Sequence, residues 1–316
     1  MREVALIIIF NHRYDKNLSY LEDMYRNRFS NRFYLMPFYD GSQENVIPVY
    51  DRSIFFEGYI AQGANVFYEK KFKHYLFVAD DMIIHPGINE NTYQDFFEVN
   101  EHQSWIPELM SLQDIYKPWN GTLEAVFYQK KQPWIEVGNE LPTYEVALEK
   151  FKKQGIVIRE LKRKEIFGSI FAKNSSLSRK IFLLFRIVSR IRHPFKNSYK
   201  LPYPICGSYS DICLVSGDCI KRFAHYCGVF SSTLLDVEVA LPTALVLASD
   251  TKIKSEKSTK RKGMAYWNPW GAFYKSEEQL MSNLEKKYKN LDDMITNFPD
   301  NQLYIHPVKL SKWLNK

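Results

Sequence analysis

The chain has 316 residues, of which 45% are hydrophobic and 25% are charged, a globular composition that excludes a disordered protein. Its net charge of +7 favours a negatively charged partner: nucleic acid, an anionic membrane surface or a phosphate-bearing substrate. No segment reaches the roughly 18 unbroken apolar residues of a membrane span, so we expect a soluble or peripheral protein.

The first hundred residues alternate strand and helix patterns. Continuous apolar runs predict buried strands, and the intervening amphipathic stretches predict helices. This order predicts an α/β fold with a mostly parallel sheet flanked by helices. The strands are expected at 4–10, 32–38 and 75–79, and the helices at 18–29 and 53–63.

Polar residues follow each of these strands. Asn11 follows the first strand, Asp40 the second, and Asp80 and Asp81 the third. Because ligands of such sheets bind beyond the carboxyl ends of the strands, these residues mark a candidate site.

A strongly basic stretch covers residues 159–200, in which Glu160 and Glu165 are the only acidic residues. We expect it to be a helical insertion in a single domain that spans 1–316. Within it, 177–193 has helical periodicity, with basic residues on one face and apolar residues on the other. Such a helix could dock on an anionic inner-leaflet surface, or it could be an ordinary core-packed helix with a solvated basic face.

The second half of the chain has further predicted elements. Short elements are expected at 106–112, 123–129 and 144–154, a strand at 212–216, helices at 217–227, 236–247 and 279–297, and an exposed loop at 252–262. The cysteines lie at 206, 213, 219 and 227 without the spacing of a zinc site, and no secretory signal opens the chain. We therefore expect reduced thiols in a cytoplasmic protein, peripheral on the inner membrane if 177–193 docks there.

The acidic pair Asp80-Asp81 is the strongest local signal. Two carboxylates at the end of a hydrophobic strand are costly unless something neutralises them. Mg²⁺ or Mn²⁺ would do so, with a nucleoside diphosphate completing its coordination. The alternative is chance, because Asp also ends strands.

Ala79-Asp80-Asp81 resembles the DxD-type motif of GT-A glycosyltransferases, which follows a strand about this far from the N-terminus. The resemblance implies that Asp81 binds the metal and that Asp80 contacts the metal or the ribose of a UDP-sugar. It also implies that Asn11 and Asp40 lie near the nucleobase and ribose.

The C-terminal segment 300–316 contains a second resemblance. His306 and Lys312 have the His-x5-Lys spacing of the element that closes the catalytic domain in glycosyltransferase family 8. This similarity implies that His306 is the third metal ligand and that Lys312, with Lys309 beside it, contacts the diphosphate. The Gly and Pro of that family's element are missing here. Neutral imidazole suits Mn²⁺, and a cation favours departure of a diphosphate.

Carboxylates between these two segments are candidates for the acceptor side. The region of Asp211, Asp236 and Glu238 is similar in general form to transferases from bacterial capsule and O-antigen clusters. An inverting enzyme needs a carboxylate as general base, whereas a retaining enzyme can use one to stabilise an oxocarbenium-like centre. Asp236 has an alternative role as the N-terminal cap of the helix that it precedes.

These residues predict a metal-assisted glycosyltransferase of bacterial surface-polysaccharide synthesis. It would move a hexose, with galactose as first candidate, from a UDP-sugar to a glycan or a polyprenyl-diphosphate-linked acceptor. A nucleotidyltransferase is the first alternative, although no glycine follows the first strand to form a phosphate loop. A nucleic-acid or polyanion-binding protein is the second; without an RRM, KH or zinc-finger signature we expect no nucleic-acid partner.

Overall fold

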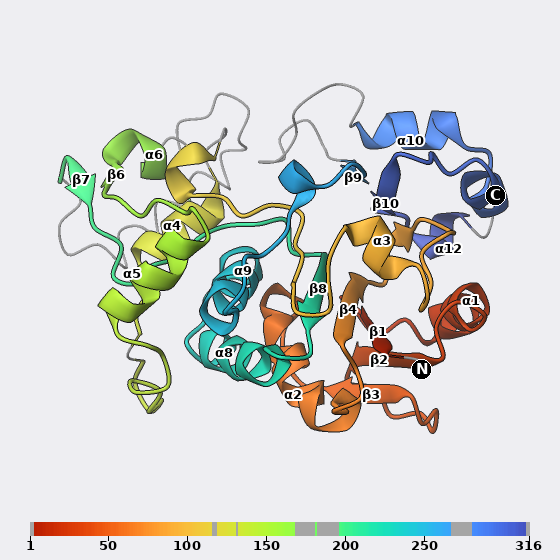
Figure 1. Cartoon of the computed structure of the whole chain (residues 1–316), viewed down its shortest axis with the longest axis horizontal. Coiled ribbons are helices and arrows are strands. Elements are labelled where there is room, and N and C mark those ends of the chain that lie inside the picture. The colour runs from red at the N-terminus through yellow and green to blue at the C-terminus, as the bar shows by residue number, and fades with distance from the viewer. Residues whose placement is uncertain are drawn as a thin grey trace.

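The computed structural model describes residues 3–115, 119–130, 132–167, 181, 196–266 and 280–313. Its centre is a five-stranded sheet in the order β3-β2-β1-β4-β8 (Figure 1). The strands are β1 (Val4–Ile9), β2 (Asn31–Pro37), β3 (Val46–Val49), β4 (His74–Ala79) and β8 (Ile212–Ser216). All neighbours pair in parallel except β8, which runs antiparallel to β4. The predicted α/β class with a mostly parallel sheet is confirmed.

Strand β1 is buried on both faces because its side chains alternate between two cores. Ala5, Ile7 and Ile9 face one core, which α2 (Glu57–Phe67), α8 (Ile220–Ser232) and α9 (Val237–Ala248) cover. Leu6 and Ile8 face the other core. On that side lie α1 (Asp15–Tyr25), α3 (Tyr93–Phe97), α10 (Met281–Lys287) and α11 (Leu291–Thr296).

A second, smaller sheet brings the C-terminal segment to the end of β4. Its order is β5-β10-β9, formed by β5 (Ile83–Ile84), β10 (Gln302–His306) and β9 (Lys262–Ala265). Strand β10 runs antiparallel to β5, which begins two residues after Asp81, and parallel to β9. The backbone N–H of Val308 also donates to the carbonyl of Asp81. The chain end therefore lies against the acidic pair. Figure 1 labels β9, β10 and α12 (Leu310–Trp313) in this part of the molecule.

The remaining elements are short. They are α4 (Asn120–Val126), α5 (Tyr144–Lys153), β6 (Leu161–Lys162), α6 (Arg163–Phe167), β7 (Ser198–Tyr199) and three 3-10 turns at Ser53–Phe55, Leu112–Asp114 and Glu256–Ser258. Helix α4, α5 and α6 gather at the end of the molecule away from the C-terminus (Figure 1).

Several sequence expectations are corrected. The helix expected over 279–297 is wrong as one element: α10 and α11 are separate, because Asn290 caps the second helix by accepting a hydrogen bond from the N–H of Asp293. Strand β3 was not expected; it is a short edge strand containing Pro48, which weakens its sequence signal. The basic helix expected at 177–193 lies outside the described residues except for Ile181.

Two further observations concern the cysteines and the length of the helices. All four cysteines are buried and free of disulfides. Within the described ranges, no helix has both the length and the apolar character that crossing a bilayer requires.

Candidate functional site

Asp80 links the ends of the two central strands. Its backbone N–H donates to the carbonyl of Ile9 at 2.9 Å, and its carboxylate accepts from the backbone N–H of Asn11 at 3.3 Å. The residue is only 4% exposed. Burial, reinforced by the negative charge of Asp81, raises the pKa of Asp80 to about 7. Asp80 thus holds Asn11 and the end of β4 in one rigid edge.

Asp81, Asp211 and His306 converge beside it from three strands. Nε2 of His306, at the end of β10, lies 3.0 Å from Oδ1 of Asp81 and 3.9 Å from Oδ2 of Asp211. Asp211 precedes β8, and its carbonyl accepts a hydrogen bond from the N–H of Ala79 at 2.8 Å. Sequence positions 81, 211 and 306 therefore form one cluster, because β8 pairs with β4 and β10 pairs with β5.

Aromatic rings support the imidazole of His306. Tyr209 packs edge-on against it with ring centres 5.6 Å apart, and Tyr209 stacks in turn on Tyr304 at 5.8 Å. Gly263 makes room for this arrangement, because a Cβ there would overlap the ring of Tyr304. The ring orientation of His306 is therefore set by packing before any ligand arrives.

The charges of the cluster are coupled. Burial opposes protonation of His306, but the carboxylates of Asp211 and Asp81 outweigh it and raise the pKa of His306. Burial would raise the pKa of Asp81, yet the hydrogen bond from His306 leaves the pKa of Asp81 below its usual value. Burial keeps the pKa of Asp211 raised despite His306. A proton on His306 thus supplies the positive charge that the two carboxylates need.

Asp81, Asp211 and His306 offer oxygen and nitrogen donors for a divalent cation. In the described part of the chain, no three His, Cys, Asp or Glu side chains are arranged as a ready coordination sphere. The donor set of two carboxylates and one imidazole nevertheless suits Mn²⁺. Neighbouring ligands of an octahedral ion with bonds of about 2.1 Å lie about 3 Å apart, close to the 3.0 Å between Asp81 and His306. Asp81, His306 and Asp211 fit the ion better than Asp80, whose carboxylate is turned to Asn11.

A cavity of about 440 Å³ opens at the same sheet edge, beyond β1, β2 and β3. Asn11, Arg13, Phe38, Tyr50 and Asp51 contribute to its wall. Phe38 is 59% exposed and Tyr50 64%, and their rings meet at 5.8 Å. Phe38 has a φ of 55°, a strained backbone conformation for a bulky residue. Two aromatic side chains are thus held at the surface where the sheet meets a ligand-sized hollow.

Sequence reasoning missed Phe38, Tyr50 and Asp51. Phe38 directly follows β2, and Tyr50 and Asp51 directly follow β3. A signal existed for Phe38, because it ends a predicted strand beside Asp40. Tyr50 and Asp51 gave none, because β3 itself was not expected.

Three residues that were predicted to bind the UDP-sugar are exposed. Asp40 has a side chain that is 76% exposed and forms an ion pair with Arg13 at 2.5 Å. Lys309 follows the cluster and is near enough to help lower the pKa of Asp81. Lys312 lies in α12 and is exposed.

Two of the three predicted acceptor-side carboxylates, Asp236 and Glu238, lie at the start of α9, whereas the third, Asp211, lies in the cluster with His306. Asp236 caps this helix by accepting from the N–H of Glu238 at 3.0 Å, which confirms the capping role. Oε2 of Glu238 accepts from Nε1 of Trp119 at 2.7 Å. Burial, together with the charges of Asp236 and Asp211, raises the pKa of Glu238 to about 8. The backbone of Ser208 donates to the carbonyl of Glu238 at 3.0 Å, so the loop that leads to Asp211 is fastened to this helix.

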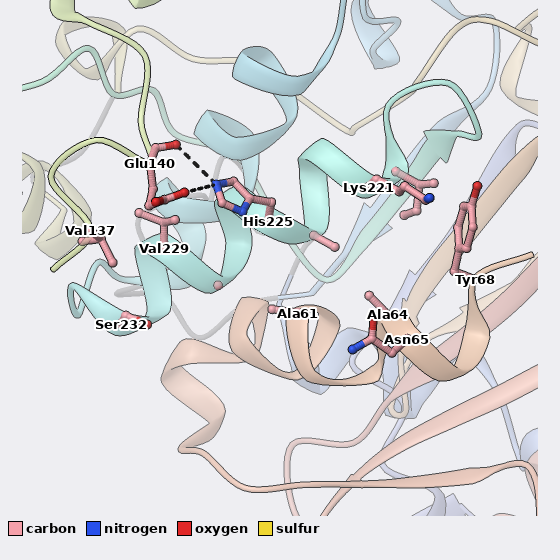
Figure 2. Close-up of a pocket in the computed structure, with 13 residues that line it drawn as sticks. Ala61, Ala64, Asn65, Tyr68, Val137, Glu140, Lys221, His225, Val229 and Ser232 are labelled. Atoms are coloured by element: carbon pink, nitrogen blue, oxygen red, sulfur yellow. Dashed lines mark hydrogen bonds and ion pairs between the residues drawn. The ribbon is translucent and has the colours of Figure 1, made fainter. Parts of the chain in front are cut away.

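A larger hollow of about 700 Å³ lies elsewhere, between α2 and α8. Figure 2 shows that small apolar residues such as Ala61, Ala64 and Val229 line part of it. At one end, Nε2 of His225 lies 3.3 Å from the carboxylate of Glu140. Lys221 lies over the ring of Tyr68 at the other end, 4.5 Å from its centre. No residue of the predicted site lines this hollow.

No protein-family model matches the chain, and no curated protein is significantly similar to it. Its function must therefore be inferred from the site itself.

Proposed function

We propose that the protein is a glycosyltransferase that moves a hexose from a UDP-sugar to a glycan or polyprenyl-diphosphate-linked acceptor, assisted by Mn²⁺ or Mg²⁺. The observation that carries the proposal is the convergence of Asp81, Asp211 and His306 at the carboxyl edge of the sheet. A cavity with exposed aromatic rings opens along the same edge. A GT-A-like arrangement would hold the nucleotide and the metal at this edge, with galactose as the first candidate sugar.

The cavity beyond β1–β3 suits a nucleoside. Phe38 and Tyr50 present ring faces and edges on which a base can stack. Asp51 lines the same hollow and can accept hydrogen bonds from a ribose diol. Its carboxylate is held in place by a hydrogen bond from Ser231 at 2.8 Å. The nucleoside half of a UDP-sugar therefore has both a stacking surface and an acceptor here.

The diphosphate belongs near the cluster of Asp81, Asp211 and His306. A bound divalent cation would act there as a Lewis acid that stabilises the departing diphosphate. Asp81 and His306 would hold it, with Asp211 as the third protein donor. Lys309, whose charge already acts on Asp81, would add a positive charge for the phosphate oxygens.

Glu238 is the residue that we assign to the acceptor. In the inverting form of the reaction, Glu238 takes the proton of an acceptor hydroxyl. The hydroxyl oxygen bonds to the anomeric carbon, and the bond from that carbon to the diphosphate oxygen breaks, so UDP leaves with the electron pair. A retaining reaction would instead use a carboxylate to stabilise the oxocarbenium-like centre.

Calorimetry of UDP binding with and without Mn²⁺ tests the proposal. We expect metal-dependent binding that weakens at least tenfold in Asp81→Asn and His306→Ala, because each substitution removes a metal ligand. Asp95→Asn and His102→Ala are matched controls outside the cluster and should bind as the unaltered protein does. Absence of UDP binding, or equal binding by all variants, would overturn the proposal. The reaction product distinguishes this function from the nucleotidyltransferase alternative, because a nucleotidyltransferase releases pyrophosphate whereas a glycosyltransferase releases UDP.

A further inference from the structure

Trp119 and Glu238 are 119 residues apart in the chain, yet their side chains meet. The indole N–H of Trp119 donates to Oε2 of Glu238 at 2.7 Å. Trp119 is 7% exposed, and Glu238 is only partly exposed. When Glu238 is ionised, this hydrogen bond is charge-assisted, short and directional, so it fixes the carboxylate as well as stabilising it.

The indole is held by its packing against two glycines. A Cβ on Gly121 would lie 2.4 Å from the Trp119 ring, and a Cβ on Gly207 would lie 2.8 Å from it. Gly207 exchanges both backbone hydrogen bonds with Met110, so its own position is fixed. The ring therefore lies directly against the backbone of the loop that leads to Asp211.

The backbone of Glu238 is held independently. Asp236 accepts a hydrogen bond from its N–H, and Ser208 donates one to its carbonyl. With Oε2 engaged by Trp119, the other oxygen, Oε1, receives no hydrogen bond from the part of the chain that the structure describes. One carboxylate oxygen is thus anchored, and the other remains able to accept a proton.

We propose that Trp119 is a positioning residue, which anchors Oε2 of Glu238 so that Oε1 can take the proton of the acceptor hydroxyl. The inference rests on the proposed function and names a second residue for its proton transfer. Trp119 also opposes the effects of burial and of the Asp236 and Asp211 charges on this carboxyl, because donation to the ionised form lowers the pKa of Glu238.

The first measurement concerns the pair itself and does not depend on activity. The indole N–H resonance of Trp119, assigned by its loss in Trp119→Phe, should move with pH as Glu238 titrates. Glu238→Gln should abolish that movement. An indole resonance that ignores pH, or that still titrates in Glu238→Gln, would overturn the contact.

The second measurement is UDP release from a UDP-sugar, with water or a sugar as acceptor. Trp119→Phe should lower kcat by about tenfold to a hundredfold, the usual scale of a misplaced reacting group, while KM for the UDP-sugar changes less than twofold. Its pH–rate profile should shift to higher pH. The double variant Trp119→Phe/Glu238→Gln should have nearly the same kcat as Glu238→Gln alone, because both substitutions act through one carboxylate. Trp105→Phe is the matched control, since Nε1 of the buried Trp105 has no hydrogen-bond partner among the described residues.

The outcomes separate the inference from the proposed function. If the unaltered protein does not bind UDP, the proposed function fails and the role in catalysis fails with it, whatever the resonance shows. If UDP binds and is released, but Trp119→Phe matches Trp105→Phe in kcat, the positioning role alone is overturned. If no release can be measured with UDP bound, the indole titration decides whether Trp119 anchors Glu238.

Discussion

Buried carboxyl groups distinguish this chain at the scale of single residues. Asp80 and Glu238 both have pKa values raised by burial, to about 7 and about 8. Each is nevertheless satisfied by one N–H donor, from Asn11 and Trp119 respectively. Glu57 differs, because it is fully buried and neither of its oxygens has a hydrogen-bond partner among the described residues. Such groups are costly, and they make clear tests of the structure.

Glu57→Gln should stabilise the protein at neutral pH. Burial, and then the charges of Asp236 and Asp51, raise the pKa of Glu57 well above its usual value. Above the pKa that Glu57 has in the unfolded chain, the folded state therefore binds more protons than the unfolded state. The stability of the folded state then falls as pH rises. We expect Glu57→Gln to gain about 1–3 kcal/mol at pH 7 and almost nothing at pH 4.

Denaturant unfolding of both proteins at the two pH values checks this. Glu149→Gln, an exposed substitution on α5, should change neither value. A loss of stability in Glu57→Gln at pH 7 would show that Glu57 has a partner.

At the scale of elements, the first turn of α9 fixes Glu238, the residue proposed for the acceptor, and a backbone hydrogen bond fixes the turn into α8. Helix α9 is apolar and buried along most of its length, so its hydrophobic pattern alone does not orient it. Its first turn does so, through the Asp236 cap and the bond from Ser208 to Glu238. The turn into α8 begins at Gly217, whose N–H donates to the carbonyl of Lys73 at 2.7 Å.

Asp236→Ala should destabilise the protein by about 1 kcal/mol, the usual cost of losing an N-cap. Asp236→Asn should retain most of this stability, because the amide oxygen can still accept from the N–H of Glu238. It should also lower the pKa of Glu238, since it removes a neighbouring negative charge. Chemical denaturation of the two variants checks the cap, and an equal loss in both would mean that charge matters more than capping.

Gly217→Ala should destabilise the protein more than an ordinary glycine substitution. A Cβ at Gly217 would lie 2.4 Å from the carbonyl oxygen of Phe72, a backbone atom that cannot move aside cheaply. We expect a loss of about 1–3 kcal/mol, as for other overpacked sites. Gly138→Ala is the control, because a Cβ there meets no atom within 4 Å. Thermal unfolding compares them, and equal melting temperatures would contradict the packing of β8 against β4.

At the scale of the whole molecule, ligand binding should raise the free energy of unfolding. The proposed site joins residues from the first strand to the last, so UDP and Mn²⁺ together should stabilise the fold as a unit. At 100 times Kd, a ligand that binds only the folded state adds about 2.7 kcal/mol. We expect a rise of several degrees in melting temperature with both ligands and a smaller one with UDP alone. In His306→Ala, UDP with Mn²⁺ should raise the melting temperature no more than UDP alone, which would show that His306 is needed for the contribution of the metal.

The basic segment 159–200 leads to a prediction about membranes. If 177–193 docks on an anionic surface, the protein should sediment with vesicles that contain an anionic lipid and not with neutral ones. Binding should weaken as salt is raised, because charge supplies the attraction. Arg186→Glu with Arg190→Glu should reduce it strongly. Failure to sediment with either vesicle type would favour the core-packed interpretation.

The sequence by itself determined the features that depend on neighbours in the chain. Buried apolar runs predicted β1, β2, β4 and β8, and the acidic pair after β4 indicated the carboxyl edge of the sheet. The patterns also singled out His306, Asp211 and Glu238, whose roles remain predictions.

Only the tertiary structure decided which of these residues meet. The pairing of the strands brings Nε2 of His306 to 3.0 Å from Oδ1 of Asp81 and to 3.9 Å from Oδ2 of Asp211. Asp40 is instead exposed and forms an ion pair with Arg13. The contact between Trp119 and Glu238 and the exposed ring of Tyr50 likewise had no signature in local pattern. The physical reason is that periodicity reports which face of an element is apolar, whereas strand pairing and packing determine which distant side chains share a site.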